Sequence, residues 1–115
     1  MIVKKDINYD LLKSVYQKKY NEEEAQTIIT FITDLYHNGN IISTIDKALL
    51  LNKFEYTAIV GNSAPIELVA KWRYDDWPDI CIICKNPLNF RDFHWRYYED
   101  NEGIEKGIAH IHCIP

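Results

Sequence analysis

The sequence predicts an α+β fold in which N-terminal helices pack beside a C-terminal, mostly antiparallel sheet of about five strands. In the first half of the chain, apolar residues recur three and four positions apart, as on one face of a helix. From Tyr56 onward the repeat shortens toward two, which is typical of strands. Turn-forming residues then recur at short intervals, and short connections favour antiparallel neighbours. The 115 residues suit a single domain, 1–115.

Three helices are expected in the first half of the chain. The first covers residues 9–19, where the apolar side chains have helical spacing. The second begins at Asn21, which can cap the helix while Glu24 completes a capping box, and it ends at residues 38–39, an Asn-Gly pair. The third begins at Ser43 or Thr44 and extends to about residue 54. Its apolar run predicts that it is buried.

Five strands are expected in the second half. They cover residues 56–60, 66–74, a short segment entering Cys81, 93–98 and 107–111. The alternation of apolar and polar side chains over 66–74 favours a strand with one buried face, on which the helices pack. A helix is the alternative there, because Ser63 can cap a helix and Pro65 suits its first turn.

Composition and charge limit the class of protein. Hydrophobic residues make up 47% and charged residues 26%, which is typical of a globular chain and not of a disordered one. The net charge of −4 disfavours broad contact with nucleic-acid phosphates and favours a basic partner. No apolar stretch approaches the ~20 residues that span a bilayer. Lys4 and Lys5 are not followed by the apolar run of a secretory signal, so we expect a cytoplasmic protein.

The cysteines and histidines near the C-terminus have the spacing of metal ligands. Cys81 and Cys84 form one pair with a two-residue gap, and His110 and Cys113 form another. Residues three apart on a straight strand point to opposite faces, so each pair must lie on a turn to reach one ion. Four such ligands predict a structural zinc site with no open coordination position. His112 is a competing ligand, and inert cysteines without a metal are the alternative.

The segment from Cys81 to Cys113 also carries a recognisable pattern. Cys-x-x-Cys-Lys-x-Pro-Leu followed by His-x-x-Cys resembles the zinc sites of zinc-ribbon and treble-clef domains. The pattern departs from the usual one at Lys85, where glycine is common. The resemblance implies a zinc ion that ties the end of the chain to its middle, with a hairpin over residues 93–107 held between the two ligand pairs.

Aromatic and acidic residues are interleaved in the second half of the chain. Tryptophan and tyrosine dominate protein interfaces, and carboxylates steer the encounter with a basic partner. The predicted partner-binding residues are Asp75, Asp76, Trp77, Asp79, Glu99 and Asp100, with Trp77 as the exposed anchor. Phe93, Trp95 and Tyr97 share one strand face and are expected in the core. The hypothesis is a zinc-stabilised protein-binding protein, most specifically an immunity-type or phage-encoded inhibitor that occludes a basic toxin or host enzyme.

Two alternatives stay open at this point. One is a zinc-stabilised module that binds nucleic acid despite its net charge. The other is a metal-free ribonuclease in which His94, Arg96 and Tyr98 on one strand face meet His110 and His112 on the next. The sequence contains no glycine-rich phosphate loop, nucleophile elbow or His-Glu-x-x-His helix, so we do not expect an enzyme.

Overall fold

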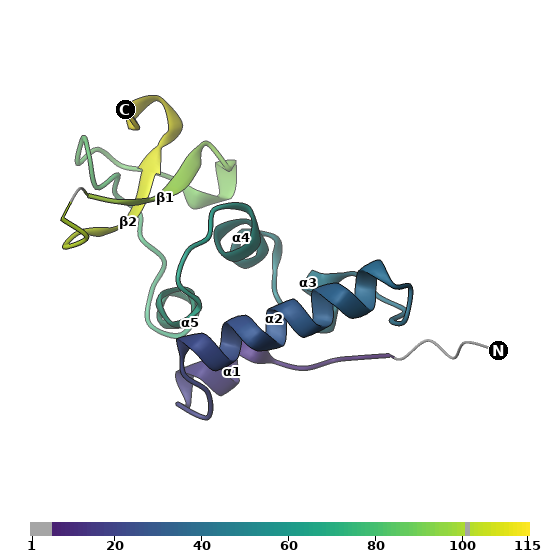
Figure 1. Ribbon diagram of the computed structural model, residues 1–115. Helices are drawn as coiled ribbons and strands as arrows, with labels where there is room; N and C mark the ends of the chain where they lie inside the picture. The colour runs from purple at the N-terminus through teal and green to yellow at the C-terminus, as the bar shows by residue number, and fades with distance from the viewer. Residues whose placement is uncertain (1–5, 101) are drawn as a thin grey trace.

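The computed structural model describes residues 6–100 and 102–115. The helices are α1 (Leu11–Tyr16), α2 (Glu22–His37), α3 (Ile45–Ala48), α4 (Lys53–Tyr56) and α5 (Ile66–Tyr74), with a π-helical turn at Thr57–Gly61 and 3₁₀ turns at Phe90–Asp92 and Ile111–Cys113. Two strands, β1 (Trp95–Glu99) and β2 (Lys106–His110), form an antiparallel hairpin. The helices and the hairpin occupy different ends of the molecule (Figure 1). The α+β class is therefore confirmed.

The N-terminal segment that was inspected for a secretory signal lies almost entirely outside the described residues. Within residues 6–100 and 102–115, every helix is too short or too polar to cross a membrane.

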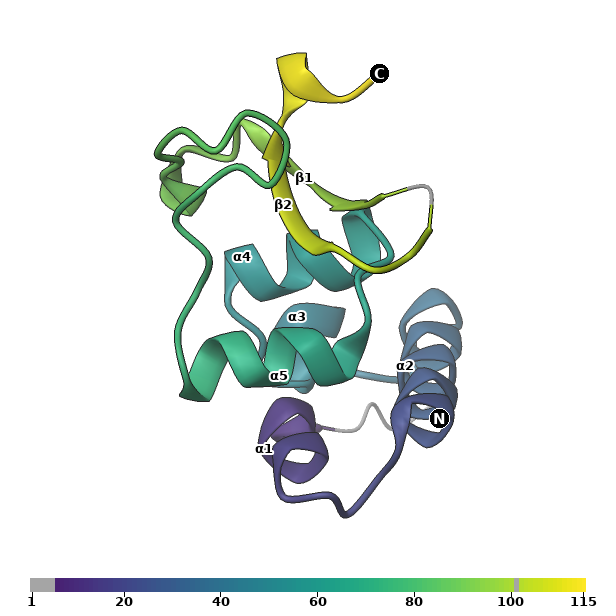
Figure 2. The same ribbon diagram turned by 90° about the vertical axis from the view of Figure 1, so that its left-hand side faces the viewer.

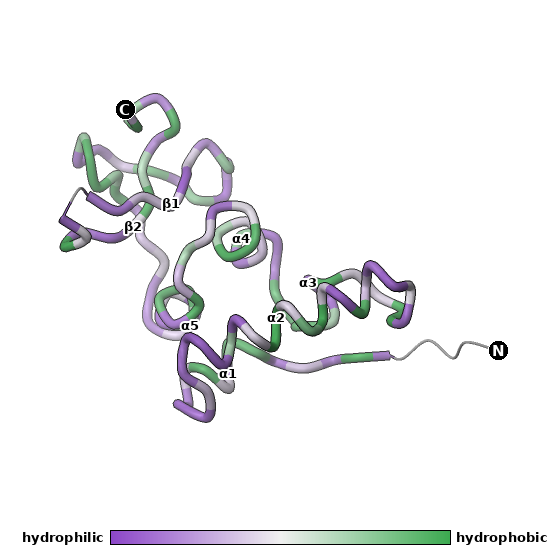
Figure 3. Tube along the Cα trace, in the orientation of Figure 1, coloured by the Kyte–Doolittle hydropathy of each residue, from purple (hydrophilic) through white to green (hydrophobic). Residues whose placement is uncertain are grey.

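The first two helices form where their local signals predict them. In α1, the Asp10 carboxylate accepts a hydrogen bond from the Lys13 amide at 3.1 Å. Asn21 and Glu24 form the complete capping box that opens α2, and Gly39 adopts φ +72° just beyond its end. Figure 3 shows hydrophilic and hydrophobic residues alternating along α2, as expected for a helix with one face on the core.

The third predicted helix is interrupted. It is divided into α3 and α4 because Leu50 adopts the left-handed φ of 54° between them. Asn52 and Glu55 then form a second capping box, which starts α4. The sequence prediction missed this restart, although Asn52 and Glu55 have the same spacing as Asn21 and Glu24.

The prediction of five strands is wrong. Residues 66–74 form α5, the alternative that Pro65 allowed, because the Glu22 carboxylate accepts hydrogen bonds from the Ile66 amide at 2.9 Å and the Glu67 amide at 2.8 Å. Residues 56–60 continue α4 into the π-helical turn. Within them, the adjacent residues Ala58 and Ile59 are both buried, whereas on a strand one of the two would face the solvent. The segment entering Cys81 makes only an isolated bridge, between Ile80 and Pro87.

The predicted C-terminal hairpin is confirmed. Trp95 pairs with His110 and Glu99 pairs with Lys106, so the strands run from residues 95 to 99 and 106 to 110. Trp95 and Ile108 are buried, whereas Phe93 lies just before β1 and is partly exposed. Seen from the side, the hairpin lies above α4, whereas α1 lies below α5 (Figure 2).

An aromatic cluster joins the helices to the C-terminal segment. Its members are Phe54, Trp72, Trp77, Phe90, Phe93 and Trp95. Trp77 stacks on Phe90 with ring centroids 4.8 Å apart, and Trp72 lies 5.1 Å from Trp77. Since these residues come from α4, α5 and the loops around the hairpin, their packing fixes the position of the C-terminal segment on the helices.

A partly buried ion-pair network connects three helices. Arg73 of α5 donates two hydrogen bonds of 2.6 Å to the carboxylate of Glu55, which is 1% exposed. The same guanidinium contacts Asp10 at 2.7 Å and the Leu50 carbonyl at 2.8 Å. These contacts hold α1, α4 and α5 together and raise the pKa of Arg73, first through the hydrogen bond to Glu55.

Candidate metal centre

Cys81, Cys84, His110 and Cys113 converge at the end of the hairpin. Their ligating atoms all lie within 4.8 Å of one another. Cys81 is buried and the other three residues are partly exposed. The predicted pairing of the two motifs is therefore confirmed as a cluster that could hold a metal ion.

A tight turn places the first pair of sulfurs on one side of the chain. The Cys81 amide donates to the Asn86 carbonyl at 3.0 Å, and the Lys85 amide donates to the Cys81 carbonyl at 2.9 Å. Lys85 adopts the left-handed φ of 63°, a conformation that glycine adopts more readily than other residues. The turn thus brings Cys84 back toward Cys81.

A 3₁₀ turn places the second pair. β2 ends at His110, and residues 111–113 turn so that Cys113 returns to the same point. The Nδ1 atom of His110 lies 3.4 Å from the Cys84 sulfur and 3.9 Å from the Cys113 sulfur. His112 stacks on His110 with ring centroids 5.0 Å apart, but it lies outside the ligand cluster. The structure thus brings His110, and not His112, into the cluster that could hold a metal ion.

Strand β2 is joined directly to the cysteine turn. The Ile82 amide donates to the Ile108 carbonyl at 3.1 Å, and the His110 amide donates to the Cys81 sulfur at 3.4 Å. A Cβ atom on Gly107 would lie only 2.8 Å from the Cγ2 atom of Ile82. Glycine at this position therefore permits the close approach that brings the two ligand pairs together.

The cysteine sulfurs differ in their electrostatic surroundings. Burial opposes ionisation of the Cys81 thiol, but backbone amides, chiefly those of Cys84, His110 and Ile83, donate to it and lower its pKa to about 6. Partial burial raises the pKa of Cys113, and the Cys84 and Cys81 sulfurs raise it further, to about 11. Three thiolates this close repel one another, and a bound cation would remove that repulsion.

The structure separates the predicted partner-binding residues into two groups. Asp75, Asp76, Trp77 and Asp79 line one surface groove, with a volume of about 410 Å³, whose other lining residues are Trp72, Arg73, Phe90 and Arg91. Glu99 and Asp100 lie instead at the tip of the hairpin, where they accept hydrogen bonds from Tyr97 and Ile104. The tip of the hairpin lies on the opposite side of the molecule from the C-terminal end of α5 (Figure 2).

Trp77 contributes to the core as well as to this groove. It packs among four other aromatic rings and is only partly exposed. The lining of the Asp75–Asp79 groove thus combines acidic side chains with the stacked rings of Trp77 and Phe90.

The histidines considered for ribonuclease chemistry are only partly brought together. His94 and His110 line one surface pocket of about 610 Å³, together with Arg91. β2 ends at His110, so His112 does not share a strand face with it, and Arg96 pairs with Ala109. His110 also belongs to the metal cluster.

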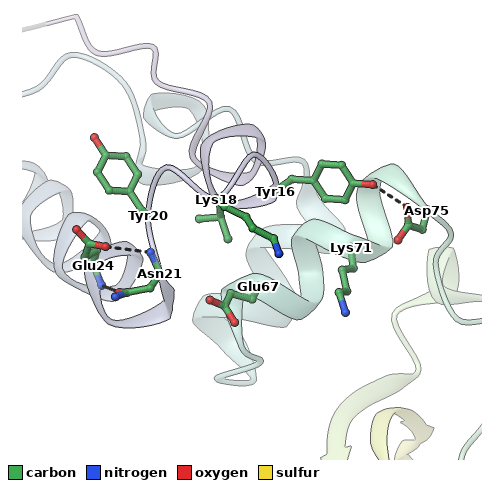
Figure 4. Close-up of a pocket in the computed structure, with 9 residues that line it drawn as sticks. Tyr16, Lys18, Tyr20, Asn21, Glu24, Glu67, Lys71 and Asp75 are labelled. Atoms are coloured by element: carbon green, nitrogen blue, oxygen red, sulfur yellow. Dashed lines mark hydrogen bonds between the residues drawn. The ribbon is translucent and has the colours of Figure 1, made fainter.

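A further groove that the sequence did not predict lies between α5 and the end of α1 (Figure 4). The Tyr16 hydroxyl donates to Asp75 at 3.0 Å, which raises the pKa of Tyr16. The other charged side chains, among them Lys18, Glu67 and Lys71, point in different directions and do not converge on one point. Its mixed charges favour no particular ligand.

Comparison with known proteins supplies no further identification. The sequence matches no protein-family model, no curated protein and no solved structure at a significant level. The function is therefore inferred from the metal cluster and the surfaces that it supports.

Proposed function

We propose that this chain is a small zinc-stabilised protein-binding domain, whose metal centre holds the Asp75–Asp79 groove in position for a basic side chain of a partner. The observation that carries the proposal is the convergence of three sulfurs and one imidazole nitrogen within 4.8 Å. Four protein ligands leave no open position for water or substrate, so the role of the ion is structural.

Zinc fits the ligand set in both chemistry and size. Thiolate and imidazole are the ligands of structural zinc sites. Bond lengths of about 2.3 Å for Zn–S and about 2.0 Å for Zn–N give a sulfur–nitrogen separation of about 3.5 Å in a tetrahedral site. The separations of 3.4 and 3.9 Å from His110 to Cys84 and Cys113 lie on either side of this value.

Two of the four proposed metal ligands, Cys81 and Cys84, lie in the same chain segment, residues 79–88, as the groove residue Asp79. The Leu88 amide donates to the Asp79 carbonyl at 2.7 Å, and Ile80 and Pro87 form a bridge beside it. Cys81 and Cys84 lie within this closed segment. A metal bound by the two cysteines would therefore restrain Asp79 at the rim of the groove.

The groove has the chemistry to hold an arginine or lysine side chain. The aliphatic stem can lie against the ring of Trp77 while the cation meets Asp76 and Asp79, next to Arg91, which already lies over the Phe90 ring. The chain contains its own example of such a contact, because the guanidinium carbon of Arg91 lies 4.8 Å from the centroid of the Phe90 ring. The net charge of −4 adds long-range attraction for a basic partner.

The most specific form of the proposal is an immunity-type or phage-encoded inhibitor that acts in the cytoplasm. Such a protein works by covering a basic surface of a toxin or a host enzyme, which requires a rigid acidic surface. The metal cluster and the Asp75–Asp79 groove support this form because together they provide rigidity and negative charge.

The metal part of the proposal can be tested by native mass spectrometry of the reduced protein. We expect one zinc ion per chain, which is lost in Cys84→Ser and Cys113→Ser because each leaves only three ligands. His112→Ala is the matched control, since His112 lies beside the cluster without belonging to it. A parent protein without metal, or equal loss of metal in His112→Ala, would falsify the assignment.

The binding part can be tested with the partner that copurifies from the source cell. Changing Asp76 and Asp79 to Asn should weaken its binding by about tenfold, or 1.4 kcal/mol, through loss of two charge contacts. Changing Glu99 to Gln and Asp100 to Asn removes the same charge at the hairpin tip and should have little effect. Equal effects of the two double variants would exclude the groove as the binding surface.

The same preparation also distinguishes the alternatives. Copurified nucleic acid whose affinity falls steeply with salt would favour the nucleic-acid-binding module. RNA cleavage that is lost in His94→Ala would favour the ribonuclease.

A further inference from the structure

The three sulfurs of the metal cluster differ in accessibility. Cys81 is 0% exposed, and its sulfur accepts a hydrogen bond from the His110 amide at 3.4 Å. Cys84 and Cys113 are partly exposed, so they are the more accessible two of the three cysteines. All three cysteines are free thiols in the structure.

We propose that Cys84 and Cys113 form an oxidation site, at which a peroxide joins the two sulfurs in a disulfide and thereby releases the metal. The inference rests on the proposed function, because it requires that the reduced protein holds zinc. It adds a control of binding by the redox state of the cell.

The position of the two sulfurs favours this pair. Both face the same nitrogen, with the Cys84 sulfur 3.4 Å and the Cys113 sulfur 3.9 Å from His110 Nδ1. The ligating atoms of the cluster lie within 4.8 Å of one another, so a short movement brings the sulfurs to the disulfide bond length of about 2.05 Å.

The reaction takes place in two balanced steps. The thiolate of one exposed cysteine attacks a peroxide oxygen, the O–O bond breaks, and sulfenic acid and hydroxide form. The second thiol then attacks the sulfenic sulfur, the S–O bond breaks, and water leaves as the disulfide forms. Sulfur loses two electrons in total, and hydrogen peroxide accepts them.

Loss of these two thiolates leaves the metal with Cys81 and His110 alone. Two ligands do not complete a structural zinc site, so the ion dissociates. The segment over residues 79–88 then loses its metal restraint, and Asp79 loses its fixed position at the groove. Oxidation should therefore weaken partner binding, and a thiol reductant should restore it.

A disulfide between Cys81 and Cys84 is the main competing product. It is disfavoured because Cys81 is 0% exposed, so peroxide cannot reach its sulfur. The two possible products are distinguished by which cysteine remains a free thiol.

The experiment treats zinc-loaded parent protein with hydrogen peroxide in the presence of a zinc-sensitive dye. Free thiols are then alkylated and mapped by peptide mass spectrometry. We expect release of one zinc per chain, loss of the thiols of Cys84 and Cys113, retention of the Cys81 thiol, and recovery of zinc binding after reduction. Cys113→His keeps four zinc ligands but lacks one partner thiol, so it should retain zinc much longer under the same peroxide.

Other outcomes overturn the inference. Zinc release with a Cys81-containing disulfide, or with sulfinic acids and no disulfide, refutes the assigned pair. A disulfide between Cys84 and Cys113 without zinc release refutes the control of the metal. Reduced protein that never holds zinc refutes the proposed function itself, and that result is already visible before peroxide is added. The mapping on the parent protein remains decisive if Cys113→His fails to fold.

Discussion

The close approach of β2 to the cysteine turn allows a direct test of how the metal centre is built. Gly107 lies in β2, and a methyl group added there would lie 2.8 Å from the Cγ2 atom of Ile82. Carbon atoms in favourable contact are about 3.5–4.0 Å apart. Gly107→Ala must therefore push the strand and the turn apart, and with them His110 and Cys81.

The size of the effect follows from this overlap. Forcing one extra methyl group into a well-packed site costs about 1–3 kcal/mol. The strain is greatest when the metal holds the two ligand pairs together, and it is relieved when β2 and the turn separate. The zinc dissociation constant of Gly107→Ala should therefore rise by about 5- to 150-fold.

Competition with a chromophoric chelator measures this change. Gly61→Ala is the matched control, since its new Cβ atom would lie 3.8 Å from the Thr57 Cγ2 atom, an ordinary contact. Adding Ile82→Ala to Gly107→Ala removes the methyl group that clashes and should recover most of the affinity. If Gly107→Ala binds zinc as tightly as Gly61→Ala, the close approach is not needed for the site.

Three more predictions concern stability. Arg73→Ala leaves the carboxylate of Glu55 buried without its partner, which should lower the free energy of unfolding by about 3 kcal/mol. The midpoint of thermal denaturation should therefore fall by about 12 °C. Lys71→Ala, on the same helix, is the control and should have little effect. Trp77→Ala leaves a cavity in the aromatic cluster and should lower the free energy of unfolding, measured in urea, by about 2 kcal/mol or more. Phe31→Ala is the matched control, because Phe31 is exposed and its loss should cost little. Removing the metal with a chelator should speed hydrogen exchange in β1 and β2 and leave the circular dichroism of the helices almost unchanged. Loss of the helical signal would show that the helices also depend on the metal.

The helices show which sequence signals are sufficient for prediction. α2 was predicted correctly because Asn21 and Glu24 are three residues apart and act on the same helix end. α5 was predicted as a strand because the carboxylate that satisfies its first amides belongs to Glu22, 44 residues before Ile66. A contact over such a distance cannot be read from the local pattern, and it decided between two otherwise similar alternatives.

The metal cluster was predictable for a different reason. The spacing of Cys81 and Cys84, and of His110 and Cys113, is set by the geometry of binding one ion, so it is visible in the sequence before the fold is known. The acidic residues carry no such constraint. Their separation into a groove and a hairpin tip depends on where α5 ends and where the hairpin turns, both of which depend on tertiary packing.

The ion-pair network around Arg73 has a consequence for cooperativity. One guanidinium contacts Asp10, Leu50 and Glu55, which belong to segments that are separate in the sequence. Local opening of α4 or α5 separates Arg73 from Glu55 and leaves one of the two charges without its partner inside the protein, which costs about 3–5 kcal/mol. Amide protons of α4 and α5 are therefore expected to exchange together, as one foldon.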